Sequence, residues 1–344
     1  MSGLLLTSFF LFLFSFFNLL GIQSSLAYSQ LFNFLIALII FWTIRRYGRQ
    51  SIHLNNRFFY WTFVVLMVIT YIVGYEVKGS KRWIDLYFFN FQPSEFFKIF
   101  FIAFLADFFS QSTTKLEEIS TFFKSIIYWL LPFLIIYKQP DLGNATVIFI
   151  IFAGLILFSY IPKKYLLFSG VLVIIFSIFF MFTLKDYQRL RLASFLNPSI
   201  DQTGTSYNMI QAIITVGSGG FFGRGLGLGT QSRYYFLPEN RTDFAFSSLV
   251  EQFGMAGGLM VIILYFVIIY FLISKAIKYY YQKNQDGQFS FYYCLGLTTL
   301  IFFQMFINID MNLGILPIAG IALPLISYGG SSTVSWMLGL ALLP

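Results

Sequence analysis

The sequence contains one histidine, His53, and one cysteine, Cys294, and this scarcity excludes several kinds of active site. A zinc site, a Ser-His-Asp triad, a Cys-His pair and a disulfide each need more of these residues. A chemical step must therefore use carboxylates, lysines, arginines, hydroxyls or a metal ion held by oxygen ligands. We expect His53 to be solvated in a basic loop and Cys294 to pack inside an apolar stretch.

Four groups of polar residues interrupt the apolar chain, and the first lies between residues 78 and 98. Pro93 is typical of the first turn of a helix. Gln92, Glu95 and Lys98 follow one another at steps of three residues, which places them on one helix face. Either Glu95 complements the helix start while Lys98 reaches the membrane surface, or the cations receive a pyrophosphate. The polar and aromatic residues of this group are Lys78, Ser80, Lys81, Arg82, Trp83, Asp85, Phe91, Gln92, Ser94, Glu95 and Lys98, with Pro93 at the helix start.

The second group surrounds Asp141, in the stretch from Lys138 to Asn144. The pattern Pro-Asp-x-Gly is ordinary turn chemistry, and Asp141 is placed where it can cap the helix that follows. A cap and a contact with substrate are both open for this carboxylate.

The third group begins with a glycine-rich stretch at residues 217–232 and continues through Glu239 to Asp243. The glycines lack the dinucleotide-binding spacing, so we expect them to let the backbone approach a bulky ligand or a neighbouring helix. Asp243 begins a long apolar run, where a helix cap is one interpretation. Glu251 follows about two turns later, and two carboxylates directed along one outward-opening cavity exceed what capping requires.

The fourth group, residues 308–332, places Pro317, Pro324 and paired glycines inside an apolar stretch. This pattern predicts a broken helix, which a membrane tolerates only where protein or a water-filled cavity satisfies the freed backbone. Ser327 and Ser331 are candidates for substrate contact there. We do not expect Ser331 to act as a nucleophile, because no histidine base is available.

The elements that position these groups are predicted to be membrane-spanning helices. Hydrophobic residues make up 58% of the 344 residues and charged residues only 10%, whereas about 25% of a soluble domain is charged. We expect an all-α polytopic membrane protein, folded as a single domain over residues 1–344, whose span phenylalanines mostly face lipid. The ten candidate spans lie near residues 4–22, 27–44, 58–75, 94–110, 121–137, 143–160, 164–184, 243–273, 289–309 and 317–341.

The distribution of charge predicts the orientation of the chain. Lys and Arg are more frequent in one set of short loops, so we expect that set, and both termini, to be cytoplasmic. Residues 185–242 then form a large extracytoplasmic loop between spans 7 and 8, in which Tyr207–Ile214 suits an amphipathic helix at the outer interface. The net charge of +8 lies in short clusters, which favours membrane lipids and anionic lipid-linked substrates and disfavours nucleic acid.

In their order along the chain these motifs resemble the SEDS family (shape, elongation, division and sporulation), which includes RodA and FtsW. The segments Tyr207–Gln211 and Gly229–Ser232 look more like the RodA branch. Two positions depart from the family pattern, because Arg241 replaces a usual His and Gln252 replaces the second Glu of Glu-Glu-x-Gly. The other motifs that carry the resemblance are Lys81–Trp83, Phe91–Glu95, Gln139–Gly143, Phe236–Glu239, Thr242–Phe244 and Pro324–Ser332.

The resemblance implies a peptidoglycan glycosyltransferase of the bacterial cytoplasmic (inner) membrane. Such an enzyme polymerises lipid II into β-1,4 glycan strands at the outer face, for cell wall biogenesis and cell shape. The implied partners are a class B penicillin-binding protein, which supplies the transpeptidase, and other membrane proteins of the elongation machinery. A divalent cation, Mg²⁺ or Mn²⁺, is implied by the resemblance alone, because no spacing in the chain defines its ligands. The essential Asp of the family falls on Asp243.

We expect Asp243 to deprotonate the acceptor hydroxyl while cations stabilise the undecaprenyl pyrophosphate leaving group. Three alternatives stay open: a lipid II flippase without catalysis, an FtsW-like division glycosyltransferase, and a purely structural scaffold. The candidate cations are Lys81, Arg82, Lys98, Arg189 and Arg191. The other candidate substrate contacts are Trp83, Glu95, Asp141, Glu239, Glu251, Ser327 and Ser331.

Overall fold

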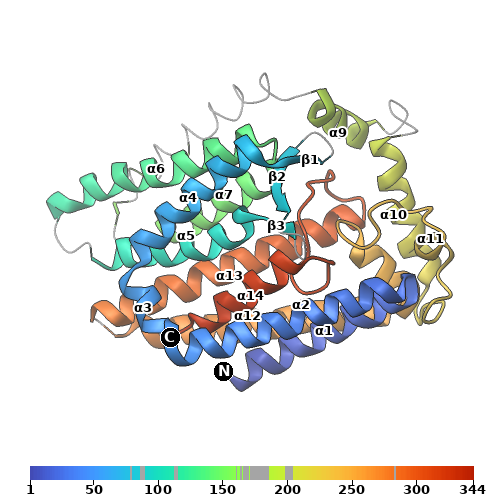
Figure 1. The fold of residues 1–344 in the computed structure, drawn as a ribbon, viewed down its shortest axis with the longest axis horizontal. Helices are drawn as coiled ribbons and strands as arrows, with labels where there is room; N and C mark the ends of the chain where they lie inside the picture. The colour runs from blue at the N-terminus through green and yellow to red at the C-terminus, as the bar shows by residue number, and fades with distance from the viewer. Residues whose placement is uncertain are drawn as a thin grey trace.

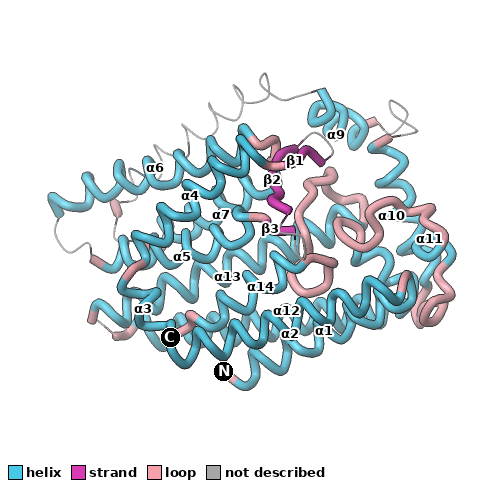
Figure 2. The backbone as a smooth tube through the Cα atoms, in the orientation of Figure 1, coloured by secondary structure: helices cyan, strands magenta, loops and turns pink. Residues whose placement is uncertain are grey.

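The computed structural model is a bundle of long helices, with a small sheet and several long loops toward one end (Figures 1 and 2). It describes residues 1–77, 80–85, 90–111, 115–159, 161–162, 165, 170, 186–197, 204–282 and 284–344. The predicted span near 164–184 lies almost entirely outside these residues.

Within the described residues, six helical stretches are long and apolar enough to cross a bilayer, which confirms an all-helical multi-pass architecture. The count of ten spans and the cytoplasmic termini stay predictions, although the chain ends lie toward the same end of the bundle, opposite α10 and α11 (Figure 1). The six are α1 (Ser2–Ile22), the run Ser24–Leu54 formed by α2 (Ser24–Thr43), the π-helical η1 (Ile44–Gly48) and α3 (Arg49–Leu54), α4 (Asn56–Val73), Ser120–Lys138 of α6 (Lys115–Lys138), α12 (Ala245–Tyr280) and α13 (Gln285–Asn312).

Three further helices match predicted spans but differ from a simple apolar crossing. Helix α5 (Pro93–Ser110) carries Glu95, Lys98 and Asp107, and α7 (Leu142–Leu157) has only 16 residues. The predicted span 317–341 is a broken one, because α13 ends at Asn312 and α14 starts only at Gly330. This break confirms the interpretation of the two prolines and the paired glycines.

Helix α5 lies in the core, where it contacts α13, α4 and α14. Phe97, Phe101 and Phe104 are buried, and each ring lies against Tyr60 of α4. The expectation that span phenylalanines mostly face lipid is therefore wrong for this helix, whose rings fill the protein interior. Cys294 of α13 is fully buried, as expected. His53 is only half-exposed, because its ring packs edge-on against Phe289.

A three-stranded antiparallel sheet precedes α5, and the all-α prediction did not include it. Its strands are β1 (Tyr75–Val77), β2 (Ser80–Asp85) and β3 (Asn90–Phe91), in the order β1-β2-β3. Tyr75 pairs with Trp83, and Ile84 pairs with Phe91. The sheet matters for the site because β2 carries Lys81, Arg82 and Trp83.

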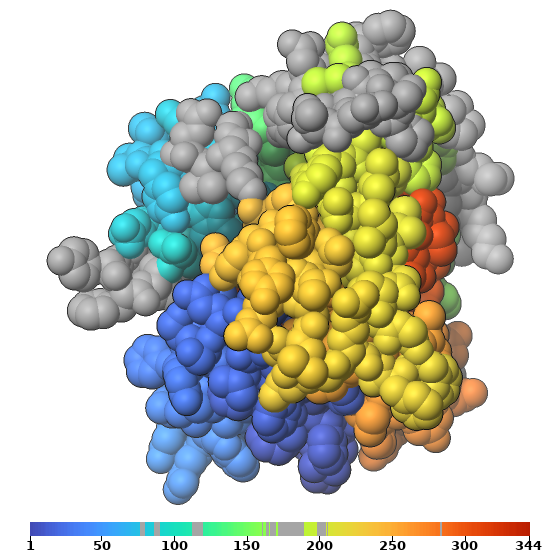
Figure 3. Space-filling view, turned by 90° about the vertical axis from the view of Figure 1, so that its right-hand side faces the viewer, coloured from blue at the N-terminus to red at the C-terminus, as the bar shows by residue number. Residues whose placement is uncertain are grey.

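The described part of the long loop forms α9 (Asp186–Leu196), α10 (Thr205–Gly219) and α11 (Thr230–Arg233). Helix α10 confirms the predicted helix at Tyr207–Ile214. Figure 3, turned to face the end that carries these helices, shows residues 204–244 in yellow and gold covering much of it.

The glycine-rich stretch between α10 and α11 packs against a break in α12. Gly254 has φ 72° and ψ −178°, values that interrupt the helix and favour glycine. Met255 N then donates to Gly220 O at 2.9 Å, and Arg224 N donates to Glu251 O at 2.9 Å. A Cβ atom at Gly223 would lie 2.2 Å from Gln252 O. Of the two predicted uses of these glycines, close approach to a neighbouring helix is the one found.

Candidate active site

Asp243 lies just before α12, and its side chain is half-buried. The helix has Phe244 at its N-cap position and no capping side chain, so the capping interpretation of Asp243 is wrong. The Asp243 backbone carbonyl accepts hydrogen bonds from Asn308 Nδ2 at 3.1 Å and from Asn312 Nδ2 at 3.0 Å. The residue is thus held through its main chain by α13.

The long loop brings a cation close to the Asp243 carboxylate. A Cβ atom built on Gly320 would lie 3.7 Å from Arg191 Nη1 and 3.8 Å from Asp243 Oδ2, so the two charged groups flank the same point. Arg191 Nη1 also donates to Ile318 O at 3.5 Å. Gly320 has φ 65°, a conformation that favours glycine. Arg189, on the same helix α9, is exposed.

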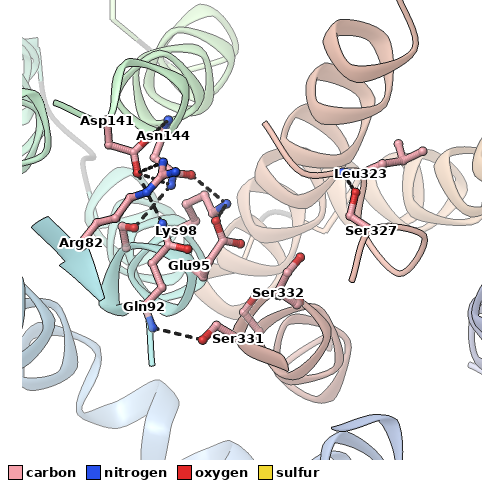
Figure 4. Close-up of polar contacts among 12 residues, drawn as sticks. Arg82, Gln92, Glu95, Lys98, Asp141, Asn144, Leu323, Ser327, Ser331 and Ser332 are labelled. Atoms are coloured by element: carbon pink, nitrogen blue, oxygen red, sulfur yellow. Dashed lines mark hydrogen bonds and ion pairs between the residues drawn. The ribbon is translucent and has the colours of Figure 1, made fainter. Parts of the chain in front are cut away.

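A buried hydrogen-bonded network surrounds Asp141 (Figure 4). Arg82 Nη1 lies 3.2 Å from Asp141 Oδ2, and Gln92 Nε2 donates to the same oxygen at 3.3 Å. Asn144 donates to Asp141 through its backbone N at 3.1 Å and through Nδ2 at 2.9 Å. Asp141 therefore caps α7, as one interpretation predicted, and it also anchors Arg82.

The electrostatics of Arg82 connect this network to Asp243. The charge of Asp141 raises the pKa of Arg82, burial opposes that effect, and the charges of Asp243 and Glu95 add to it. For Asp141, burial favours the neutral acid. The charge of Arg82 and the hydrogen bonds from Asn144 and Arg82 outweigh burial, so the pKa of Asp141 lies below its ordinary value. Arg82 is thus a permanent cation that is paired with Asp141 and is also stabilised by the charges of Asp243 and Glu95.

Glu95 and Lys98 form the inner part of the network. Lys98 Nζ lies 2.7 Å from Glu95 Oε1 and donates to Asn144 Oδ1 at 3.1 Å. Lys98 is 2% exposed and Glu95 7%, so of the two readings left open, the one in which Lys98 reaches the membrane surface is wrong. A charge this deeply buried needs a partner, and Glu95 supplies it.

Ser327 and Ser331 both make structural hydrogen bonds. Ser327 Oγ donates to Thr242 O at 2.6 Å and accepts from Leu323 N at 2.8 Å, which ties the broken segment to the chain before Asp243. Ser331 Oγ accepts from Gln92 N at 3.0 Å and donates to Asn90 O at 2.9 Å. Figure 4 shows Ser331 beneath the Asp141 network and Ser327 in a separate place.

Glu251 is a structural cap, not the second carboxylate of an open cavity. It is fully buried, and it accepts from Gln231 N at 2.8 Å, from Ser232 N at 2.9 Å and from Ser232 Oγ. Its charge therefore stabilises the first turn of α11. Glu239 is half-buried, has φ 53°, and accepts from Thr242 Oγ1 at 2.7 Å. The structure does not bring Glu251 to the Asp141 network.

Gln252, at one of the two positions that depart from the family pattern, also has a structural role. Its Nε2 donates to Asn18 Oδ1 at 2.7 Å, and its Oε1 accepts from Gly227 N at 3.0 Å. A carboxylate could accept but could not donate. At Arg241, the other departure, the backbone carbonyl accepts from Tyr328 N at 2.7 Å.

The remaining candidates on β2 differ in exposure, with Lys81 exposed and Trp83 half-buried. Sequence reasoning assigned no role to Asn144, Asn308 and Asn312, which hold Asp141 and Asp243. The available signal was an asparagine inside an apolar helix, since a polar side chain there requires a partner.

The described residues contain no group of three or more His, Cys, Asp or Glu side chains that could hold a metal ion. Two of the candidate carboxylates already have cationic partners: Asp141 is paired with Arg82, and Glu95 is paired with Lys98. These residues do not fit a resident divalent-cation site built by the protein alone.

Comparison with known proteins places the chain in one family. The model of the FtsW, RodA and SpoVE cell cycle proteins matches residues 3–344. The peptidoglycan glycosyltransferase MrdB of Escherichia coli is 35% identical over 80% of this chain and 73% of that protein. The corresponding protein of Helicobacter pylori is 33% identical over 88% and 78%. A probable peptidoglycan glycosyltransferase FtsW of Hydrogenovibrio crunogenus is 34% identical over 81% and 71%.

Solved structures show the same fold. A chain from a study of polymerization and crosslinking by a peptidoglycan synthase complex matches with a TM-score of 0.84 and 24% identity, over 100% of this chain and 96% of that one. The rod shape determining protein RodA of Thermus thermophilus matches with a TM-score of 0.72 and 22% identity, over 100% and 95%. The chain belongs to the FtsW, RodA and SpoVE family, the SEDS peptidoglycan glycosyltransferases.

Proposed function

We propose that this chain polymerises lipid II at the outer face of the cytoplasmic membrane, with Asp243 as the general base. The observation that carries the proposal is the position of the Asp243 carboxylate. It is half-buried, does not cap α12, flanks the same point as Arg191, and lies close enough to Arg82 to raise its pKa. A base beside fixed cations is what transfer from a pyrophosphate requires.

In the proposed step Asp243 accepts the proton of the acceptor's 4-hydroxyl as that oxygen attacks the anomeric carbon of the donor. The bond from this carbon to the pyrophosphate oxygen breaks, and undecaprenyl pyrophosphate leaves with the electron pair. Attack opposite the leaving group converts an α-linked donor into a β-1,4 product. Arg82 and Arg191 stabilise the departing charge, and the exposed Lys81 and Arg189 attract the anionic substrate.

Lys98 has a supporting role in this proposal. Its ammonium group is buried and paired with Glu95, so together with Arg82 and Asp141 it forms a network of two positive and two negative charges. This network fixes Arg82 in place. In this proposal Lys98 does not contact the phosphate, because its ammonium group is buried and paired with Glu95.

A divalent cation, Mg²⁺ or Mn²⁺, remains an expectation from family resemblance. No step above depends on it, because the described carboxylates do not form a ligand set. An ion carried mainly by the pyrophosphate oxygens is the form compatible with these residues. Titrating chelator and then Mg²⁺ into a polymerisation assay tests this role, and activity that survives chelation removes it.

We also propose a role in cell elongation, with a class B penicillin-binding protein as partner. The RodA-like segments and the RodA fold neighbour support this role, while the curated relatives include both MrdB and FtsW proteins. The fold neighbour from a peptidoglycan synthase complex supports the partnership. Expression in cells depleted of their own elongation or division enzyme distinguishes the two roles: restored rods support elongation, and restored septa alone contradict it.

The purified chain with labelled lipid II tests the chemistry directly. We expect glycan polymer on a gel from the wild type and none from Asp243→Asn. The matched control is Asp286→Asn, an exposed carboxylate at the start of α13, which should polymerise normally. Transport of lipid II without polymer would favour a flippase. Full activity of Asp243→Asn would contradict the assignment of the base.

A further inference from the structure

Two buried asparagines of α13 hold the main chain of Asp243. Asn308 and Asn312 lie one turn apart, and neither is exposed. Each donates a hydrogen bond from Nδ2 to the Asp243 carbonyl, at 3.1 Å and 3.0 Å. A carbonyl that receives two amide donors from one rigid helix has little freedom to move.

The other bonds of these asparagines fix the orientation of both amides. Asn312 Oδ1 accepts from Ser247 N at 2.9 Å and from Ser247 Oγ at 2.6 Å, so its Nδ2 must point toward Asp243. Asn312 Nδ2 also donates to Asn308 O at 2.8 Å. Asn308 Nδ2 donates to Ile321 O at 2.7 Å as well. The two amides therefore link three segments of the chain by hydrogen bonds: the start of α12, helix α13 itself and the broken segment that follows it.

These segments are the ones that meet at the proposed reaction point. Asn308 joins Asp243 to Ile321, the residue after Gly320, and Gly320 is the position flanked by Arg191 and the Asp243 carboxylate. A shift of α13 relative to the broken segment would therefore change the distance between the base and its neighbouring cation. We infer that Asn308 and Asn312 are positioning residues that orient Asp243 for proton transfer, an inference that rests on the proposed function.

A positioning role and a purely structural role predict different kinetics. If the asparagines orient the base, their loss lowers kcat while the folded protein still binds lipid II, because a small misplacement of a reacting group strongly slows the chemical step. If they only hold the fold together, the folded fraction falls, and activity per folded molecule stays normal.

The test compares Asn312→Asp, Asn308→Ala and Thr298→Val with wild type. Asn312→Asp keeps the acceptor for Ser247 but removes the donor to Asp243, and Asn308→Ala removes the second donor without adding a charge. Thr298→Val is the control on the same helix, because its hydroxyl bonds only to Cys294 O among the hydrogen bonds of the described residues. Folded protein is quantified by thermal melting, binding by lipid II titration, and kcat by polymer yield.

We expect kcat of each asparagine variant to fall about 10- to 100-fold per folded molecule, with lipid II affinity within about 2-fold and Thr298→Val unchanged. Either asparagine variant folded with full kcat overturns the inference, and so does a parallel fall in affinity and kcat. If one variant fails to fold, the other still decides. Absence of polymer from the wild type would instead count against the proposed function.

Discussion

Two aspartates act on the same arginine, and the protein holds them in different ways. Asp141 is 2% exposed, and its carboxylate oxygens accept hydrogen bonds from Asn144, Gln92 and Arg82. Asp243 is half-buried, and its backbone carbonyl accepts hydrogen bonds from Asn308 and Asn312. A carboxylate bound through its oxygens is a structural anion. The two amide donors on the Asp243 carbonyl give this residue a defined position that does not depend on contacts of its carboxylate oxygens.

The largest expected effect comes from removing the two charges separately. Asp243→Asn should lower polymerisation by about 10³-fold or more, because the general base is lost, and should lower the melting temperature less than Asp141→Asn, because Asp243 is half-buried whereas Asp141 is 2% exposed. Asp141→Asn should instead lower the melting temperature, since Arg82 loses its nearest anion. Parallel assays of melting and polymer yield check both variants. A strongly destabilised Asp243→Asn would erase the contrast between the two aspartates.

The next effect concerns the buried pair that supports Arg82. Lys98→Met should destabilise the protein by about 3–5 kcal/mol, because it leaves Glu95 charged, buried and unpaired. Adding Glu95→Gln should recover most of this loss. The exposed Lys81→Met is the control and should change stability by less than about 0.5 kcal/mol. Equal losses in the single and double variants would show that the two charges are not coupled.

Much of this architecture follows from the sequence because membrane spans and turn chemistry are local signals. Apolar length predicts α1, α2, α4, α12 and α13, and Pro-Asp-x-Gly correctly indicates the cap at Asp141. The sheet was missed because β1 and β3 have three and two residues, too few for alternation to register.

The site was harder to predict because partners far apart in sequence decide what each polar residue does. Glu251 and Asp243 look alike in the sequence, as carboxylates near one apolar run. In the structure, however, Glu251 accepts a hydrogen bond from the backbone N of Ser232 in α11, which lies 19 residues away in the sequence. For Lys98 the sequence leaves both a surface position and a pyrophosphate contact open, because its partner Asn144 lies 46 residues away. Only the packing of α5 against α7 brings that pair together.

A smaller effect is expected at Glu251. In Glu251→Gln the side chain keeps its shape, but its NH₂ group faces a backbone N–H of α11 and one hydrogen bond is lost. The cost should be about 1–3 kcal/mol, with polymerisation per folded molecule close to that of wild type. Chemical denaturation and polymer yield measure the two quantities. Loss of activity in a folded Glu251→Gln protein would restore Glu251 as a direct participant in the reaction.

The smallest effect is the pH dependence that Asp141 contributes. Its pKa is lower in the folded protein than in the unfolded chain, so the stabilisation is fully present above the ordinary Asp pKa of about 3.9 and is lost as pH falls through the lower folded value. In a plot of melting temperature against pH, Asp141→Asn should therefore show a smaller fall than wild type below about pH 4. At neutral pH the two plots should run parallel. An unchanged acid limb would mean that Asp141 is not the titrating anchor of Arg82. The acid sensitivity of the fold would then come from other carboxylates, and the contrast between a structural Asp141 and a catalytic Asp243 would lose this support.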